Sequence, residues 1–175
     1  MNALSIEWEG KEGEDMTDND RLLIERACTR LVLQFAQAND DWDHDGIADC
    51  FAEDGSFARP IDPENPYRGR ETIRAMFRDR PRRLGRHLMT NIFIHVDSPT
   101  TAHGRSYITY LSTSDVDQPR PALAEPGIFV GWFDDEFLLT PDGWRIAARK
   151  GGMALRSGGE IPTVGARPEP AAQEA

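Results

Sequence analysis

The chain has 175 residues and a formal net charge of −10, from 20 basic and 30 acidic side chains. Apolar residues make up 39% of it, and no run approaches the roughly 18 to 20 apolar residues that a membrane-spanning helix needs. A negative charge of this size opposes contact with nucleic acid backbones or anionic membrane surfaces. We therefore expect no nucleic acid and no membrane partner. Because the first residues do not resemble a secretory signal, we also expect a cytoplasmic location.

The two ends of the chain differ from its middle. Residues 1–15 show no hydrophobic periodicity, and residues 157–175 are rich in glycine, proline and alanine. Neither segment has enough apolar side chains to offset the entropy lost on ordering. We expect a disordered leader over 1–15, one domain over 16–156 and a disordered tail over 157–175.

The first element expected along the chain is a long helix. Thr17 opens it, with Asp20 three residues later in capping-box spacing. Apolar residues then recur at helical spacing as far as about Asn39. One row of mostly apolar side chains along that helix continues to Asp40, so a carboxylate ends the row.

Two shorter helices are expected next. One begins at Asp45 and ends at the turn signal Asp54–Gly55, and a short strand is expected from Phe57. After a loop with three prolines, a third helix follows Gly69 and ends before Pro81. Three helices therefore precede the rest of the domain.

From His87 onward the hydrophobic pattern alternates, and β-branched and aromatic residues become frequent. Short connections between such runs indicate antiparallel neighbours. Helices followed by an antiparallel sheet predict an α+β fold in which the helices cover one face of the sheet. The expected strands are 87–96, 101–111, 128–139 and 144–149.

The turns predict which residues face each other across the sheet. A three-residue loop over 141–143, with Gly143 in the left-handed region, places Asp135 opposite Arg149 as a structural pair. A turn that sets Val96 opposite Thr101 gives three further pairs, which mix polar and apolar side chains and so suit a ligand pocket. These pairs are His87 with Tyr110, Met89 with Ile108, and Asn91 with Ser106.

The loop 41–46, DWDHDG, resembles the opening of an EF-hand calcium loop. Its twelfth position is Ala52 instead of the bidentate glutamate that closes such a site. We therefore expect Asp43 and Asp45 to serve as helix caps rather than as calcium ligands.

No other motif implies a cofactor. Cys28 and Cys50 have no CxxC spacing and are expected to be buried free thiols. The four histidines form no HxH or HExxH pair, and no nucleotide-binding or serine-hydrolase motif occurs. We expect no metal and no cofactor, which leaves acid–base chemistry.

Asp40 and His87 are the candidate catalytic pair. One interpretation is structural, because a histidine that begins a strand is commonly held by a hydrogen bond that stabilises the fold. The other is a dyad in which the carboxylate fixes the imidazole tautomer, so that the second ring nitrogen can accept a proton from a substrate.

Four blocks over residues 17–153 resemble the SnoaL-like branch of the nuclear transport factor 2-like superfamily. The resemblance implies a cone-shaped α+β fold, with about three N-terminal helices on a strongly curved antiparallel sheet that encloses a pocket. It also implies a homodimer or homotrimer. The blocks are FAQANDDWDHDGIADCFAEDGSF, YRGRETIRAMF, RHLMTN and DEFLLTPDGWRIAAR.

Within that family, scytalone dehydratases and hexachlorocyclohexane dehydrochlorinases use a pocket aspartate and histidine as a base. Those residues match Asp40 and His87. Two tyrosines of the dehydratases fall at Asn39 and Arg59, and a second histidine falls near Ser106, which argues against scytalone itself as the substrate.

We expect a cofactor-independent lyase or isomerase that acts on a small cyclic or aromatic molecule. The alternative is a non-catalytic small-molecule binder, or a subunit that resembles the small subunit of ring-hydroxylating dioxygenases. Catalysis is assigned to Asp40 and His87. The expected pocket residues are Trp42, Phe57, Met76, Phe77, Met89, Asn91, Ser106 and Tyr110.

Overall fold

The computed structural model describes residues 16–158. The expected leader, 1–15, and all but the first two residues of the expected tail lie outside this range. Within it, three helices and six strands form an α+β fold. None of the helices in 16–158 is long and apolar enough to cross a membrane.

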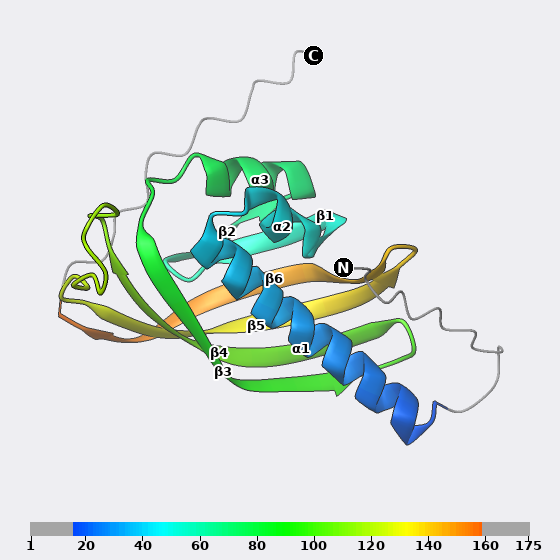
Figure 1. Cartoon of the computed structure of the whole chain (residues 1–175). Coiled ribbons are helices and arrows are strands. Elements are labelled where there is room, and N and C mark those ends of the chain that lie inside the picture. The colour runs from blue at the N-terminus through cyan, green and yellow to red at the C-terminus, as the bar shows by residue number, and fades with distance from the viewer. Residues whose placement is uncertain (1–15, 159–175) are drawn as a thin grey trace, which may run out of the picture.

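The first helix is confirmed. α1 (Asp18–Asp41) has Thr17 as its N-cap, and the reciprocal bonds of a capping box join Thr17 and Asp20. Its buried face consists of small and apolar residues, because the helix lies across the sheet (Figure 1). The helix ends at Trp42, whose left-handed backbone (φ 60°) turns the chain sharply.

The other two helices are short. α2 (His44–Asp49) is capped by the Asp43 carboxylate, which accepts from the Gly46 N–H at 2.8 Å, as predicted for Asp43. α3 (Arg70–Arg78) follows Gly69, as predicted. In Figure 1, both helices lie together beyond the C-terminal end of α1, close to β1 and β2.

A single curved sheet has the strand order β2-β1-β6-β5-β4-β3. β1 and β6 pair in parallel, and the other neighbours pair in antiparallel fashion. The prediction of a wholly antiparallel sheet is therefore wrong at this one pairing. The strands are β1 (Phe51–Arg59), β2 (Asp62–Arg68), β3 (Leu84–Val96), β4 (Thr101–Thr113), β5 (Ile128–Thr140) and β6 (Gly143–Ser157).

The segment 51–68 differs most from the prediction. Asp54–Gly55 is not a turn but lies inside β1, where the register with β6 is irregular between Phe51 and Ser56. The proline-rich stretch is β2, an edge strand that pairs with β1 alone. An edge strand tolerates proline, since one row of its backbone groups has no ladder partner.

Three predicted cross-strand pairs are confirmed, although the strands contain bulges. Asp135 lies opposite Arg149, His87 lies opposite Tyr110, and Met89 lies opposite Ile108. The β5–β6 loop is one residue shorter than predicted, since Thr140 pairs with Gly143, and an irregularity after Glu136 restores the register.

The pair of Asn91 with Ser106 is wrong. Val96 pairs with Ala102, and the β3–β4 register shifts between Thr90 and Phe93. Asn91 lies in this bulge with a left-handed backbone (φ 48°), and its side chain is exposed. A bulge of this kind turns a residue out of the alternating pattern.

The core between α1 and the sheet centres on Phe35. Its ring lies 5.6 to 6.2 Å from four other phenylalanine rings, and it is 2% exposed. Such offset and edge contacts are favourable arrangements for aromatic rings. The four partners are Phe51, Phe57, Phe77 and Phe133.

Candidate functional site

Asp40 and His87 meet at the end of α1. The Asp40 Oδ1 atom lies 2.6 Å from His87 Nδ1, and the two side chains are 9% and 11% exposed. The same carboxylate accepts the backbone N–H of His87 at 3.1 and 3.2 Å. Asp40 therefore holds both the ring and the main chain of His87, which fixes the orientation of the imidazole.

The position of β3 makes this contact possible. β3 is the edge strand of the sheet, so one row of its backbone groups faces no other strand. α1 packs beside it, and the Trp42 indole N–H donates to the Arg83 carbonyl at 2.9 Å just before the strand begins. The last turn of α1 is thus tied to the entry of β3, next to His87.

The second ring nitrogen of His87 faces Asn39, with 3.3 Å between Nε2 and the amide nitrogen. When Nδ1 carries the proton that Asp40 accepts, Nε2 has a free lone pair to which the Asn39 amide donates. The sequence prediction did not include Asn39 in the site. Its place in the last helical turn, directly before Asp40, is the signal that could have found it.

Tyr110 completes the immediate surroundings of the imidazole. Its ring centroid lies 4.3 Å from that of His87, across the β3–β4 pairing. A Cβ built on Gly85 would lie only 2.6 Å from the Tyr110 hydroxyl, so glycine at this position leaves room for the phenol.

Deeper in the fold, Asp135 and Arg149 form a buried ion pair. Two bonds of 2.6 and 2.7 Å join the guanidinium to the carboxylate, and the side chains are 1% and 0% exposed. The guanidinium also lies over the rings of Phe35 and Phe133. The Ser106 hydroxyl is fully buried, and no protein group in residues 16–158 bonds it.

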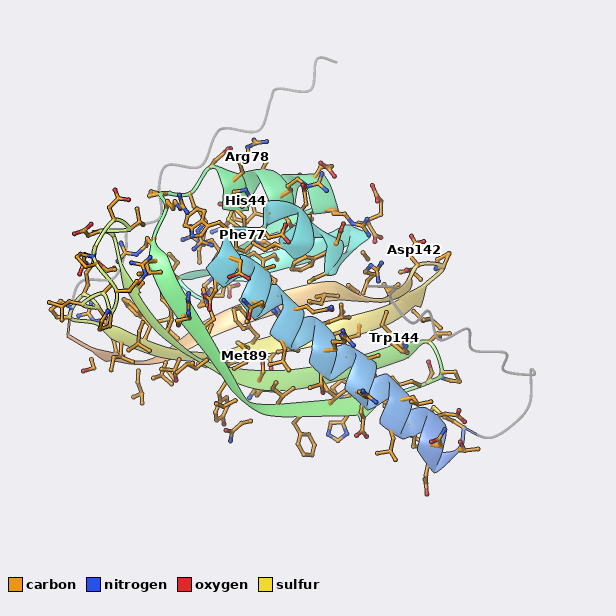
Figure 2. The ribbon with its side chains drawn as sticks, viewed as in Figure 1. His44, Phe77, Arg78, Met89, Asp142 and Trp144 are labelled. Atoms are coloured by element: carbon orange, nitrogen blue, oxygen red, sulfur yellow. The ribbon has the colours of Figure 1, made fainter. Side chains whose placement is uncertain are left out.

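The remaining predicted pocket residues occupy different environments. Phe57 and Phe77 belong to the buried aromatic cluster, whereas Met76 and Met89 pack at its margin. Figure 2 shows Phe77 near the C-terminal end of α1 and Met89 on β3 where that strand passes the helix. Asn91 is exposed in its bulge and does not join the others, because the register shift turns it outward.

The two cysteines are buried free thiols, as predicted. Burial, with the charge of Asp135 second, raises the pKa of Cys28 to about 12. Burial also raises the pKa of Cys50 to about 11. Both thiols therefore stay protonated at neutral pH and are poor nucleophiles.

A model of the SnoaL-like domain matches residues 20–150, which is most of the chain. This chain belongs to the SnoaL-like family. The match agrees with the resemblance found over 17–153, and it places this SnoaL-like protein in the nuclear transport factor 2-like superfamily. No curated protein sequence matches it.

Solved structures share the fold of this SnoaL-like protein. A candidate scytalone dehydratase from Novosphingobium aromaticivorans has a TM-score of 0.68 at 18% identity, over 87% of this chain and 100% of the other. A type 2 hexachlorocyclohexane dehydrochlorinase has a TM-score of 0.66 at 17% identity, over 90% and 100%. A protein of unknown function from Mycobacterium tuberculosis has a TM-score of 0.63 at 25% identity, over 76% and 77%.

Proposed function

We propose that this SnoaL-like protein is a cofactor-independent lyase or isomerase in which His87 removes a proton from a small cyclic or aromatic molecule. The observation that carries the proposal is the part-buried contact of 2.6 Å between Asp40 and His87 Nδ1. It assigns Nδ1 to the carboxylate and leaves Nε2 for a substrate. The named dehydratase and dehydrochlorinase among the structural relatives support the same reaction class.

The reaction follows from this geometry. The substrate takes the place of the Asn39 amide at Nε2, and a proton passes from a substrate C–H bond to that nitrogen. The Asp40 carboxylate stabilises the imidazolium that forms, as a buried charge of opposite sign does.

The electron pair of the broken C–H bond then determines the product. In a lyase it forms a double bond while a hydroxyl or halide leaves the neighbouring carbon. In a dehydration the imidazolium returns the proton to the leaving oxygen, so that water departs and His87 is neutral again. In an isomerase the pair is held as an enolate, and His87 returns the proton to another carbon.

Tyr110 is a group beside His87 that can donate a hydrogen bond to an oxygen that gains charge. Its ring packs against His87, and Gly85 leaves room for its hydroxyl. Ser106 offers a second, deeper hydroxyl, which no protein group within 16–158 bonds. Preorganised donors of this kind stabilise charge that develops in the transition state.

The test compares two histidines that both contact an aspartate through Nδ1. Wild type, His87→Gln and His103→Gln are assayed on cyclic β-hydroxy ketones and on hexachlorocyclohexane, by absorbance of the unsaturated product and by chloride release. Loss of the base should lower kcat by about 100-fold or more in His87→Gln. The His103→Gln control should keep its rate, because that pair lies on the surface.

Unchanged turnover in His87→Gln would contradict the proposal. If the wild type converts no compound of the panel, the second candidate, a binder or an assembly subunit, becomes the better account. An observation that favours assembly is the outer face of β3 and β4, where Leu88, Phe93 and Tyr107 are 51%, 65% and 47% exposed.

We also propose that this outer face mediates a homodimer or homotrimer. Sedimentation analysis of the wild type and of Phe93→Ser would test it. A shift of the variant toward a monomer is the expected result, and a monomeric wild type would exclude the oligomer.

A further inference from the structure

The segment between α3 and β3 concentrates positive charge in an acidic chain. Residues 78–86, RDRPRRLGR, hold five arginines and one aspartate. Four of these arginines have a partner in the structure. They are Arg78 with Asp79, Arg82 over the Trp42 ring, Arg83 with Glu125, and Arg86 with the Gly85 carbonyl.

The fifth, Arg80, lies over a ring as Arg82 does, but its ring belongs to the buried core. The described contact of its guanidinium is with the ring of Phe77, whose centroid lies 5.0 Å from Cζ. Phe77 is 2% exposed and contacts Phe35 and Phe57, so Arg80 points toward the inner aromatic cluster. A cation over an aromatic face is favourable, but it does not neutralise the charge.

No carboxylate in residues 16–158 forms an ion pair with Arg80 or with its neighbour Arg59. Burial first, and repulsion by Arg59 second, lower the pKa of Arg80 to about 10. The group therefore remains charged at neutral pH. Arg80 is half-buried, and a charge partly withdrawn from water without a counter-ion destabilises a fold, so structures normally compensate it.

Arg80 lies on the side of the proposed active site. The Phe77 ring under its guanidinium contacts Phe35, which lies one helical turn before Asn39, the residue that faces His87 Nε2. A molecule in contact with His87 Nε2 and Tyr110 has Arg80 within the same region of the fold.

We propose that Arg80 binds a carboxylate group of the substrate, so that this protein acts on a small cyclic or aromatic acid. The inference rests on the proposed function, since it names the substrate class of the same site. A planar guanidinium matches a planar carboxylate through two parallel hydrogen bonds. The rings of Phe77 and Tyr110 offer flat apolar surfaces for the remainder of such a molecule.

Binding of benzoate to the full chain tests the proposal, with titration calorimetry as the readout. Benzamide is the neutral control of equal shape, and inorganic phosphate tests for a general oxyanion site. We expect benzoate to bind at least about tenfold more tightly than benzamide or phosphate, because only the carboxylate is both charged and planar.

Arg80→Gln should weaken benzoate binding by about tenfold or more, since the loss of a charge-assisted bidentate contact has an effect of that size. Arg78→Gln is the matched control, because Arg78 is exposed and paired with Asp79. It should bind benzoate as the wild type does. Arg80→Lys keeps the charge without the planar fork and should show an intermediate affinity, which preserves the test if Arg80→Gln does not fold.

Three results would overturn the proposal. They are no benzoate binding to the wild type at millimolar concentration, equal binding of benzamide or phosphate, and an equal loss of binding in Arg78→Gln and Arg80→Gln. His87→Gln separates the two proposals. If His87→Gln keeps its benzoate affinity and the wild type has no turnover, the carboxylate site is supported and the catalytic proposal fails. If turnover depends on His87 but the wild type does not bind benzoate, the catalytic proposal is supported and the carboxylate site fails.

Discussion

Two histidine–aspartate pairs occur in residues 16–158, one inside the fold and one on its surface. In both, the carboxylate contacts Nδ1, at 2.6 Å for Asp40–His87 and at 2.9 Å for Asp97–His103. The inner side chains are 9% and 11% exposed, and the surface ones 47% and 55%. Both pairs have the same residue types and the same contact, so the two pairs are distinguished by their exposure to solvent and by the residues around them.

The surface pair joins the two ends of the β3–β4 turn. Water and salt screen such a pair, and exposed ion pairs contribute about 0–1 kcal/mol. The inner pair has low exposure, a second bond to the His87 backbone, Asn39 at the other ring nitrogen and Tyr110 against the ring. Burial strengthens these contacts, and the comparison shows that a His–Asp contact alone does not define a site.

The buried Asp135–Arg149 pair adds a further contrast with Asp40–His87. It is the more deeply buried of the two, but a guanidinium does not release a proton at physiological pH. The pairing is as predicted, and we continue to expect a structural role for it, although its carboxylate and cation resemble the inner His–Asp pair. A neutral imidazole has a nitrogen lone pair that can accept a proton and a guanidinium has none, which distinguishes His87 as a base.

The largest effect is expected from Asp135→Asn. The change leaves the Arg149 charge buried without compensation, which costs about 3–5 kcal/mol in the free energy of unfolding. Urea denaturation measures it. The double variant Asp135→Leu, Arg149→Met should recover most of this loss, and a stable single variant would show that water compensates the charge.

A smaller effect is expected from Asp40→Asn, with Asp97→Asn as its surface counterpart. The inner change weakens the acceptor for both the ring and the backbone N–H of His87, which should cost about 1–3 kcal/mol. Asp97→Asn should cost under about 1 kcal/mol. NMR of the ring nitrogens should also show that His87 has a single tautomer in the wild type and loses it in Asp40→Asn. An equal loss of unfolding free energy in Asp40→Asn and Asp97→Asn would contradict the distinction between the two pairs.

The smallest effect concerns the buried thiol of Cys28. Because the folded pKa of about 12 lies above the ordinary value, the unfolded chain loses this proton first as the pH rises. Its contribution to stability is therefore present below about pH 9 and decreases above it. Urea midpoints from pH 7 to 10 should fall less steeply in Cys28→Ala than in the wild type, and equal slopes would contradict the sign.

The local signals of the sequence predicted a large part of this structure. The Thr17 cap, the helix before Trp42 and the long strands follow from patterns that act over a few residues. The pair Asp135–Arg149 also follows, although the loop is shorter than predicted and a bulge restores the register. Asp40 and His87 were singled out from their places at a helix end and a strand start, and the family resemblance then favoured the dyad over a structural role.

Other features had no local signal. The parallel pairing of β1 with β6 and the edge position of β2 depend on which strands meet across the sheet, so the segment 51–68 was misread. The bulge that turns Asn91 outward depends on how β3 pairs with β4. The contact of Asn39 with His87 depends on how α1 packs beside β3.

The sequence by itself determined the helices, the long strands and the family, because hydrophobic period, capping residues and motif order are properties of neighbouring residues. Only the tertiary structure decided which polar groups are buried together. The contact of the Asp40 carboxylate with His87 joins residues distant in the chain. The Phe77 ring under Arg80 is buried by Phe35 and Phe57, which are also distant in the chain, and these contacts set the electrostatics of the candidate site.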